Sequence, residues 1–147
     1  GATPNGLNSI NGLNHYIGMK AIEPDQIPEL RFMPYVVIGL MLGGLLVAGL
    51  GKRGLLYAYL GVFVAIGVAG LYDFWRWEYD YGHNLDSTAA IRIAGMSYQP
   101  PIIGSKQLLN FTATSWPDVG GWALIVATML VAAAVFLSLF PKKPTTS

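Results

Sequence analysis

The sequence predicts an all-α membrane protein with three transmembrane helices and an outward-facing, loop-rich polar region. Of its 147 residues, 53% are hydrophobic and 12% are charged, whereas about 25% are charged in typical soluble domains. Residues 32–51, 54–72 and 120–140 contain no charged side chain. Each stretch has the roughly 20 residues that a helix needs to cross about 30 Å of hydrocarbon. A chain this short is poorly able to bury three such helices in a soluble core.

The short charged segments predict the orientation of these spans. Lys52 and Arg53 leave room only for a tight turn between the first two spans, which therefore form an antiparallel hairpin. Three crossings place these residues on the same side as Lys142 and Lys143, and clusters of this kind near span ends favour the cytoplasm. We therefore expect the 141–147 tail to be cytoplasmic. The opposite side then holds residues 1–31 and 73–119 with every acidic residue of the chain: Glu23, Asp25, Glu29, Asp73, Glu78, Asp80, Asp86 and Asp118.

The N-terminal segment, residues 1–31, is polar and rich in turn-forming residues. Asn5-Gly-Leu-Asn8 recurs as Asn11-Gly-Leu-Asn14. Asn-Gly pairs favour tight turns because both residues tolerate positive φ. We expect turns here, followed by an ordered loop with a short helix between Ala21 and Leu30.

Composition excludes several classes of function. The chain has no cysteine, which removes disulfides, thiolate metal sites and iron–sulfur clusters. A net charge of +1 gives no reason to expect nucleic-acid binding. No catalytic motif is present and no span has an ionisable residue at its centre, so we expect neither an enzyme nor an ion pump.

Small residues recur at four-residue spacing within the spans, as in Gly39/Gly43, Ala65/Ala69 and Ala123/Ala127. Such spacing lets helices approach closely in lipid. The pattern therefore indicates close helix packing, either within the chain or against partner proteins.

The segment 73–86, which follows the second span, is dense in aromatic and charged residues. Its Trp and Tyr residues fit an aromatic belt at the membrane interface, which leaves Glu78 and Asp80 less well explained. If the second helix continues, Arg76 lies one turn from Asp80 and the two can pair.

The strongest candidates for metal ligands are both histidines and nearby methionines of the outward segments. Imidazole and thioether together suit copper, and thioether favours Cu(I). His15 and Met19 would share a face of a helix, and Asp86 would serve His83 as co-ligand or as the group that fixes its tautomer. The candidate metal site is thus His15, Met19, His83, Asp86 and Met96. The alternative is that the histidines are structural hydrogen-bonding residues.

Four strings of sequence resemble a family of bacterial membrane proteins associated with gene neighbourhoods for nitrous-oxide reductase and its copper-delivery lipoprotein. These strings lie at residues 10–19, 77–86, 95–101 and 106–111. The resemblance implies an accessory role in copper handling or respiration (denitrification) on the periplasmic face of the bacterial inner membrane. It also implies further chain before Gly1.

The leading hypothesis is a non-enzymatic, membrane-anchored accessory protein that handles copper or supports assembly of a periplasmic copper enzyme. Its expected partners are membrane lipid and other membrane or periplasmic proteins. The alternative is a structural subunit of a larger membrane complex with no metal of its own.

Overall fold

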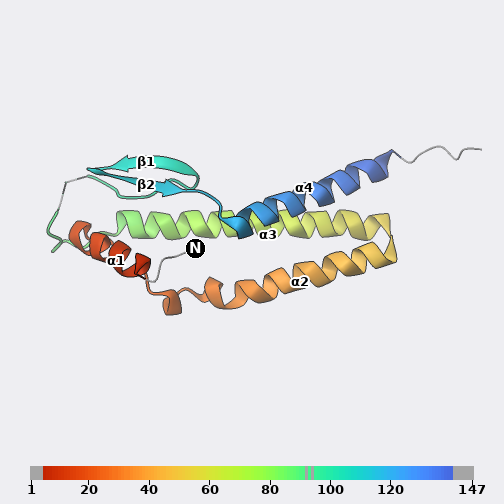
Figure 1. The fold of residues 1–147 in the computed structure, drawn as a ribbon, viewed down its shortest axis with the longest axis horizontal. Helices are drawn as coiled ribbons and strands as arrows, with labels where there is room; N and C mark the ends of the chain where they lie inside the picture. Colours follow the sequence, from red (N-terminus) through yellow and green to blue (C-terminus); the bar gives the residue numbers. More distant parts are fainter. Residues whose placement is uncertain (1–4, 92, 94, 141–147) are drawn as a thin grey trace, which may run out of the picture. The chain divides into compact units, whose positions relative to one another are not determined.

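The computed structural model describes residues 5–91, 93 and 95–140. These residues form four α-helices, a short 3-10 helix and a two-stranded sheet (Figure 1). In chain order the elements are α1 (Gly6–Ile17), η1 (Pro24–Gln26), α2 (Pro28–Leu50), α3 (Arg53–His83), β1 (Gly104–Leu108), β2 (Phe111–Ser115) and α4 (Val119–Leu139).

The chain divides into two compact units, each described by itself. The membrane unit consists of Pro28–Ala69 and Val119–Ser147. The polar unit consists of Gly1–Ile27 and Gly70–Asp118. Helix α3 contributes its first part to the membrane unit and its last part to the polar unit.

The three predicted spans are confirmed as helices. Helices α2, α3 and α4 are each long and apolar enough to cross a membrane. Neither α2 nor α4 has a buried residue within the described chain, so their apolar side chains are available to lipid. The predicted fold class, a mostly helical membrane protein, is therefore correct.

The turn between α2 and α3 is as short as predicted. Helix α2 ends at Leu50, and Gly51 adopts the left-handed conformation with φ 62°. Its amide donates to the carbonyl of Val47 at 3.1 Å, which satisfies one of the last carbonyls of the helix. Helix α3 then begins at Arg53.

Helix α3 extends well beyond the second predicted span, which ended at Tyr72. It has 31 residues, a length of about 46 Å at 1.5 Å per residue, whereas the hydrocarbon core is about 30 Å thick. Residues 54–72 of α3 carry no charge and are about long enough to cross that thickness. The last part, from Asp73 to His83, carries every acidic residue of the helix and extends beyond the predicted span.

Tyr59 packs helix α3 against helix α2 within the membrane unit. Its hydroxyl donates to the carbonyl of Leu40 at 2.8 Å. A Cβ built at Gly43 or Gly44 would lie 3.4 Å or 2.9 Å from the Tyr59 side chain. At these two glycines the small residues allow packing within the chain, which is one of the two alternatives that the sequence left open. On α4, the hydroxyl of Ser138 lies 3.1 Å from that of Tyr57.

The polar unit is more ordered than the predicted loop-rich region. Residues 6–17 form a helix instead of Asn-Gly turns. Its buried residues are Asn14 and Ile17, and Ile10 and Leu13, which are about half exposed, line a cavity beside them. The repeated asparagines hold the chain that follows. The Asn11 amide exchanges two hydrogen bonds with the backbone of Ile22, at 2.7 Å and 3.0 Å.

An antiparallel hairpin completes the polar unit and was not predicted. Gly104 pairs with Ser115 and Leu108 with Phe111, and Leu109 turns the chain with a positive φ of 55°. Leu108 is buried. Figure 1 shows the hairpin beside the last part of α3. Residues of both elements line a cavity.

Candidate functional site

The polar unit contains a cavity of about 450 Å³. Its walls come from α1, the last part of α3, the segment around Tyr98 and the hairpin. Most of its lining is apolar, and much of that is aromatic: Phe74, Trp77, Tyr81, Tyr98 and Phe111. A mostly apolar cavity with a few polar groups is the usual form of a small-molecule site.

Two buried side chains in the cavity wall each have a polar atom without a hydrogen-bond partner in the described chain. Glu78 is 2% exposed and Tyr98 is 1% exposed. Within the described part of the chain, neither Oε2 of Glu78 nor the hydroxyl of Tyr98 has a partner. Burial raises the pKa of Glu78, because an apolar environment disfavours the charged carboxylate. A buried polar atom without a hydrogen-bond partner is uncommon in folded proteins, and it indicates a position where a ligand or a water molecule can bind.

Close backbone contact with α3 fixes the position of Tyr98. The amide of Tyr98 donates to the carbonyl of Gly82 at 2.9 Å. A Cβ at Gly82 would lie 2.5 Å from both the Cα and the amide nitrogen of Gln99. Only glycine allows this approach, which brings Tyr98 and Glu78 into the same cavity wall.

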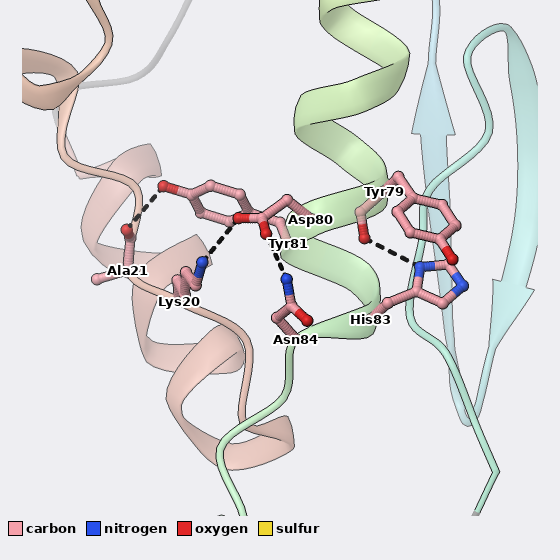
Figure 2. Close-up of polar contacts among 7 residues, drawn as sticks. All are labelled: Lys20, Ala21, Tyr79, Asp80, Tyr81, His83 and Asn84. Atoms are coloured by element: carbon pink, nitrogen blue, oxygen red, sulfur yellow. Dashed lines mark hydrogen bonds and ion pairs between the residues drawn. The ribbon is translucent and has the colours of Figure 1, made fainter.

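Polar contacts hold the other wall, formed by α1 and the chain that follows it. Lys20 pairs with Asp80 at 2.7 Å, and the hydroxyl of Tyr81 donates to the carbonyl of Ala21 at 3.3 Å (Figure 2). Asp80 also accepts a hydrogen bond from Asn84. The hydrogen bond from Lys20 is the main cause that lowers the pKa of Asp80. Asp80 therefore pairs with Lys20, whereas the sequence pointed to Arg76.

His15 and Asp86 lie close together on the surface of the polar unit. Both are exposed. Hydrogen bonds from the amide and hydroxyl of Thr88 lower the pKa of Asp86, and the charge of His15 adds to that effect. The backbone holds this region together, since the amide of Asp86 donates to the carbonyl of Gly18 at 2.8 Å.

His83 ends α3 with its ring fixed by Tyr79. Its Nδ1 lies 2.9 Å from the Tyr79 carbonyl, and the two rings stack with centroids 3.9 Å apart. Helix α3 ends at His83, so Asp86 lies beyond the helix and not one helical turn along it. A contact between the two side chains stays a prediction. Figure 2 shows the Tyr79–His83 pair and the Lys20–Asp80 pair on opposite sides of α3.

The two methionines among the candidate ligands occupy different surroundings. Met19 lines the cavity, whereas His15, four residues earlier, is exposed. They do not share a helix face, because α1 ends at Ile17 and Gly18 turns the chain with φ 80°. Met96 is half-buried, and its amide donates to the carbonyl of Ile93. Among the described residues, no three His, Asp or Glu side chains gather as a metal site.

Sequence reasoning noted that an aromatic belt does not explain Glu78, but it did not find the cavity. Each of two helices contributes a pair of lining residues that are four positions apart in the sequence. These pairs are Leu13 and Ile17 on α1, and Trp77 and Tyr81 on α3. This spacing is the feature of the sequence from which the cavity could have been predicted. Tyr98 lies in a loop with no periodicity, and its contribution depends on the contact at Gly82.

The fold defines the class of this protein as a membrane protein with three apolar helices and a folded polar unit. Comparison with protein-family models, with curated proteins and with solved structures finds no match in any of the three.

Proposed function

We propose that this protein is a non-enzymatic, membrane-anchored accessory protein that handles copper or supports assembly of a periplasmic copper enzyme. In this proposal the polar unit faces the periplasm and the α2–α3 turn faces the cytoplasm. The sequence resemblance to proteins from nitrous-oxide reductase gene neighbourhoods supports the same role.

The hydrogen bond between His83 and Tyr79 is the observation that carries the proposal. A backbone carbonyl only accepts, so Nδ1 of His83 must donate to Tyr79 across their 2.9 Å contact. Nε2 is then the nitrogen with a free lone pair, on an exposed side chain. Metal-binding histidines commonly use one ring nitrogen in this way to orient the other.

His15 and Asp86 supply a second set of donors. Thr88 donates two hydrogen bonds to Oδ1 of Asp86, at 2.7 Å and 2.8 Å. In this proposal the imidazole of His15 is the donor that suits copper, and Oδ2 of Asp86 is a weaker oxygen donor beside it. His83 and the His15–Asp86 pair thus act as separate sites of one or two donors. Such small donor sets suit transfer, in which a partner protein completes the coordination.

Anaerobic loading with Cu(I) tests the proposal. Purified protein in detergent is incubated with Cu(I), desalted and analysed for bound metal, beside His83→Ala, His15→Ala and the double variant. We expect retained copper in the parent protein, a reduced amount in each single variant and none in the double variant. Asn8→Ala, an exposed change on α1, is the matched control and retains the parent level. No copper in the parent protein, or equal copper in the double variant, refutes the proposal.

The alternative function is a structural subunit of a larger membrane complex. A Cβ built at Gly39 meets no atom of the described chain within 4 Å, unlike one at Gly43. This open small-residue position on α2 favours close packing by another helix. Purification in mild detergent separates the two functions, because a stable complex in which this chain carries no copper supports the structural one.

A further inference from the structure

The cavity of the polar unit combines a flat aromatic lining with two unpartnered polar groups. Trp77 and Tyr81 stack on each other, with ring centroids 4.1 Å apart, and both line the cavity with Phe74 and Phe111. Aromatic walls favour a planar ring, which they contact edge-on or in offset stacking. Aliphatic chains gain no such preference.

The polar groups restrict the ligand further. Tyr98 and Glu78 are each nearly fully buried, and neither the hydroxyl of Tyr98 nor Oε2 of Glu78 has a partner in the described chain. Burial raises the pKa of Glu78, because the described lining holds no basic side chain that would stabilise the carboxylate. A protonated Glu78 and Tyr98 can both donate a hydrogen bond, and a ligand with an acceptor oxygen would satisfy them.

We propose that this cavity binds a planar, uncharged, carbonyl-bearing ring, whose oxygen accepts hydrogen bonds from Glu78 and Tyr98. A quinone head group has this chemistry, and the volume of about 450 Å³ is sufficient for a single substituted ring. An anionic ligand does not fit, because the described lining offers it no basic side chain. Neither His15 nor His83 lines this cavity, so this site is independent of the proposed copper function.

The test is equilibrium dialysis of purified full-length protein in detergent against duroquinone. We expect saturable binding to the parent protein. Glu78→Leu and Tyr98→Phe each remove one donor, and each should weaken binding about tenfold. Glu78→Gln keeps an N–H donor at this position and should retain binding within about threefold.

Tyr72→Phe is the matched control. Tyr72 belongs to the same unit, but its side chain is exposed and does not line the cavity. Loss of its hydroxyl should therefore leave duroquinone binding unchanged, and near-ultraviolet circular dichroism checks that each variant is folded.

Dioctanoylglycerol, which carries ester carbonyls without a planar ring, forms the second arm. We expect it to compete poorly with duroquinone. The proposal is overturned by absence of saturable duroquinone binding, by equal binding to folded Glu78→Leu and Tyr98→Phe, or by preferential binding of dioctanoylglycerol.

Discussion

Lys20 and Asp80 lie 60 positions apart in the sequence, yet their side chains form an ion pair of 2.7 Å. The pair connects the chain after α1 to the last part of α3. Both side chains are about half exposed, at 52% and 44%, so water and salt screen the attraction. The pair therefore positions α1 more than it stabilises the fold.

Lys20→Met should lower the free energy of unfolding by only about 0.2–1 kcal/mol, the usual range for an exposed ion pair. The hydrogen bond from Lys20 lowers the pKa of Asp80, so the contribution is fully present above the unfolded pKa of about 3.9. This stabilisation is lost as the pH falls through the pKa of Asp80 in the folded protein, which is lower than its pKa in the unfolded chain. Thermal unfolding in detergent at pH 3 and pH 7, with low and high salt, measures this effect. A loss that is equally large at pH 3 would contradict the ionic origin.

Glu78→Gln should have the opposite pH dependence. Burial raises the pKa of Glu78, so the unfolded chain ionises more readily than the folded one. The parent protein then loses stability as the pH rises above the unfolded pKa of about 4.3. A glutamine side chain cannot ionise, so we expect the variant to be more stable than the parent at pH 8 and similar to it at pH 4.

Thermal unfolding of the Glu78→Gln variant across this pH range checks the prediction. Glu23→Gln is the matched control, because Glu23 is exposed and should leave the pH dependence unchanged. Equal slopes for the parent protein and Glu78→Gln would show that Glu78 is ionised in the folded state.

The membrane helices could be predicted from sequence because lipid imposes a single local requirement. Uninterrupted apolar length decides a span, and residues 32–51, 54–72 and 120–140 meet this condition without reference to one another. The structure places helices α2, α3 and α4 over these stretches. The sequence did not indicate where α3 ends, because charged residues continue a helix as readily as they end one.

The polar unit was harder to predict because its order depends on contacts between distant residues. The Asn-Gly repeat has a local preference for turns, but burial of Asn14 and Ile17 and the hydrogen bonds of Asn11 with Ile22 override it, and the segment forms α1. Likewise, Tyr98 enters the cavity wall only through its contact with Gly82. His83 and Asp86 were expected to lie one helical turn apart, but α3 ends at His83 and Asp86 lies in the chain that follows.

Tyr59→Phe should weaken the packing of α2 against α3. The variant removes the hydroxyl that donates to the carbonyl of Leu40 at 2.8 Å. Hydrogen bonds between membrane helices contribute about 0.6 kcal/mol on average and about 1.7 kcal/mol at most. Unfolding by sodium dodecyl sulfate from mixed micelles measures the change.

Tyr72→Phe is the control for this variant. Tyr72 lies on the same helix, and its side chain is exposed. Loss of its hydroxyl should have little effect. If both variants unfold at the same detergent fraction, the Tyr59 hydroxyl does not contribute to helix packing.

Gly82→Ala and Gly12→Ala should change stability in opposite directions, although both glycines lie within α-helices. At Gly82 the new methyl group would lie 2.5 Å from the backbone of Gln99, and backbone atoms cannot move aside as a side chain does. We expect a loss of about 1–3 kcal/mol, as for overpacking elsewhere, together with displacement of Tyr98.

At Gly12 no described atom lies within 4 Å of the new Cβ. Alanine there should add about 0.5–1 kcal/mol, because it restricts the unfolded chain and favours the helix. Thermal unfolding of the two variants in the same detergent compares them directly. A stabilising Gly82→Ala would mean that Gln99 does not approach α3 this closely, and the wall that holds Tyr98 beside Glu78 would have to be different.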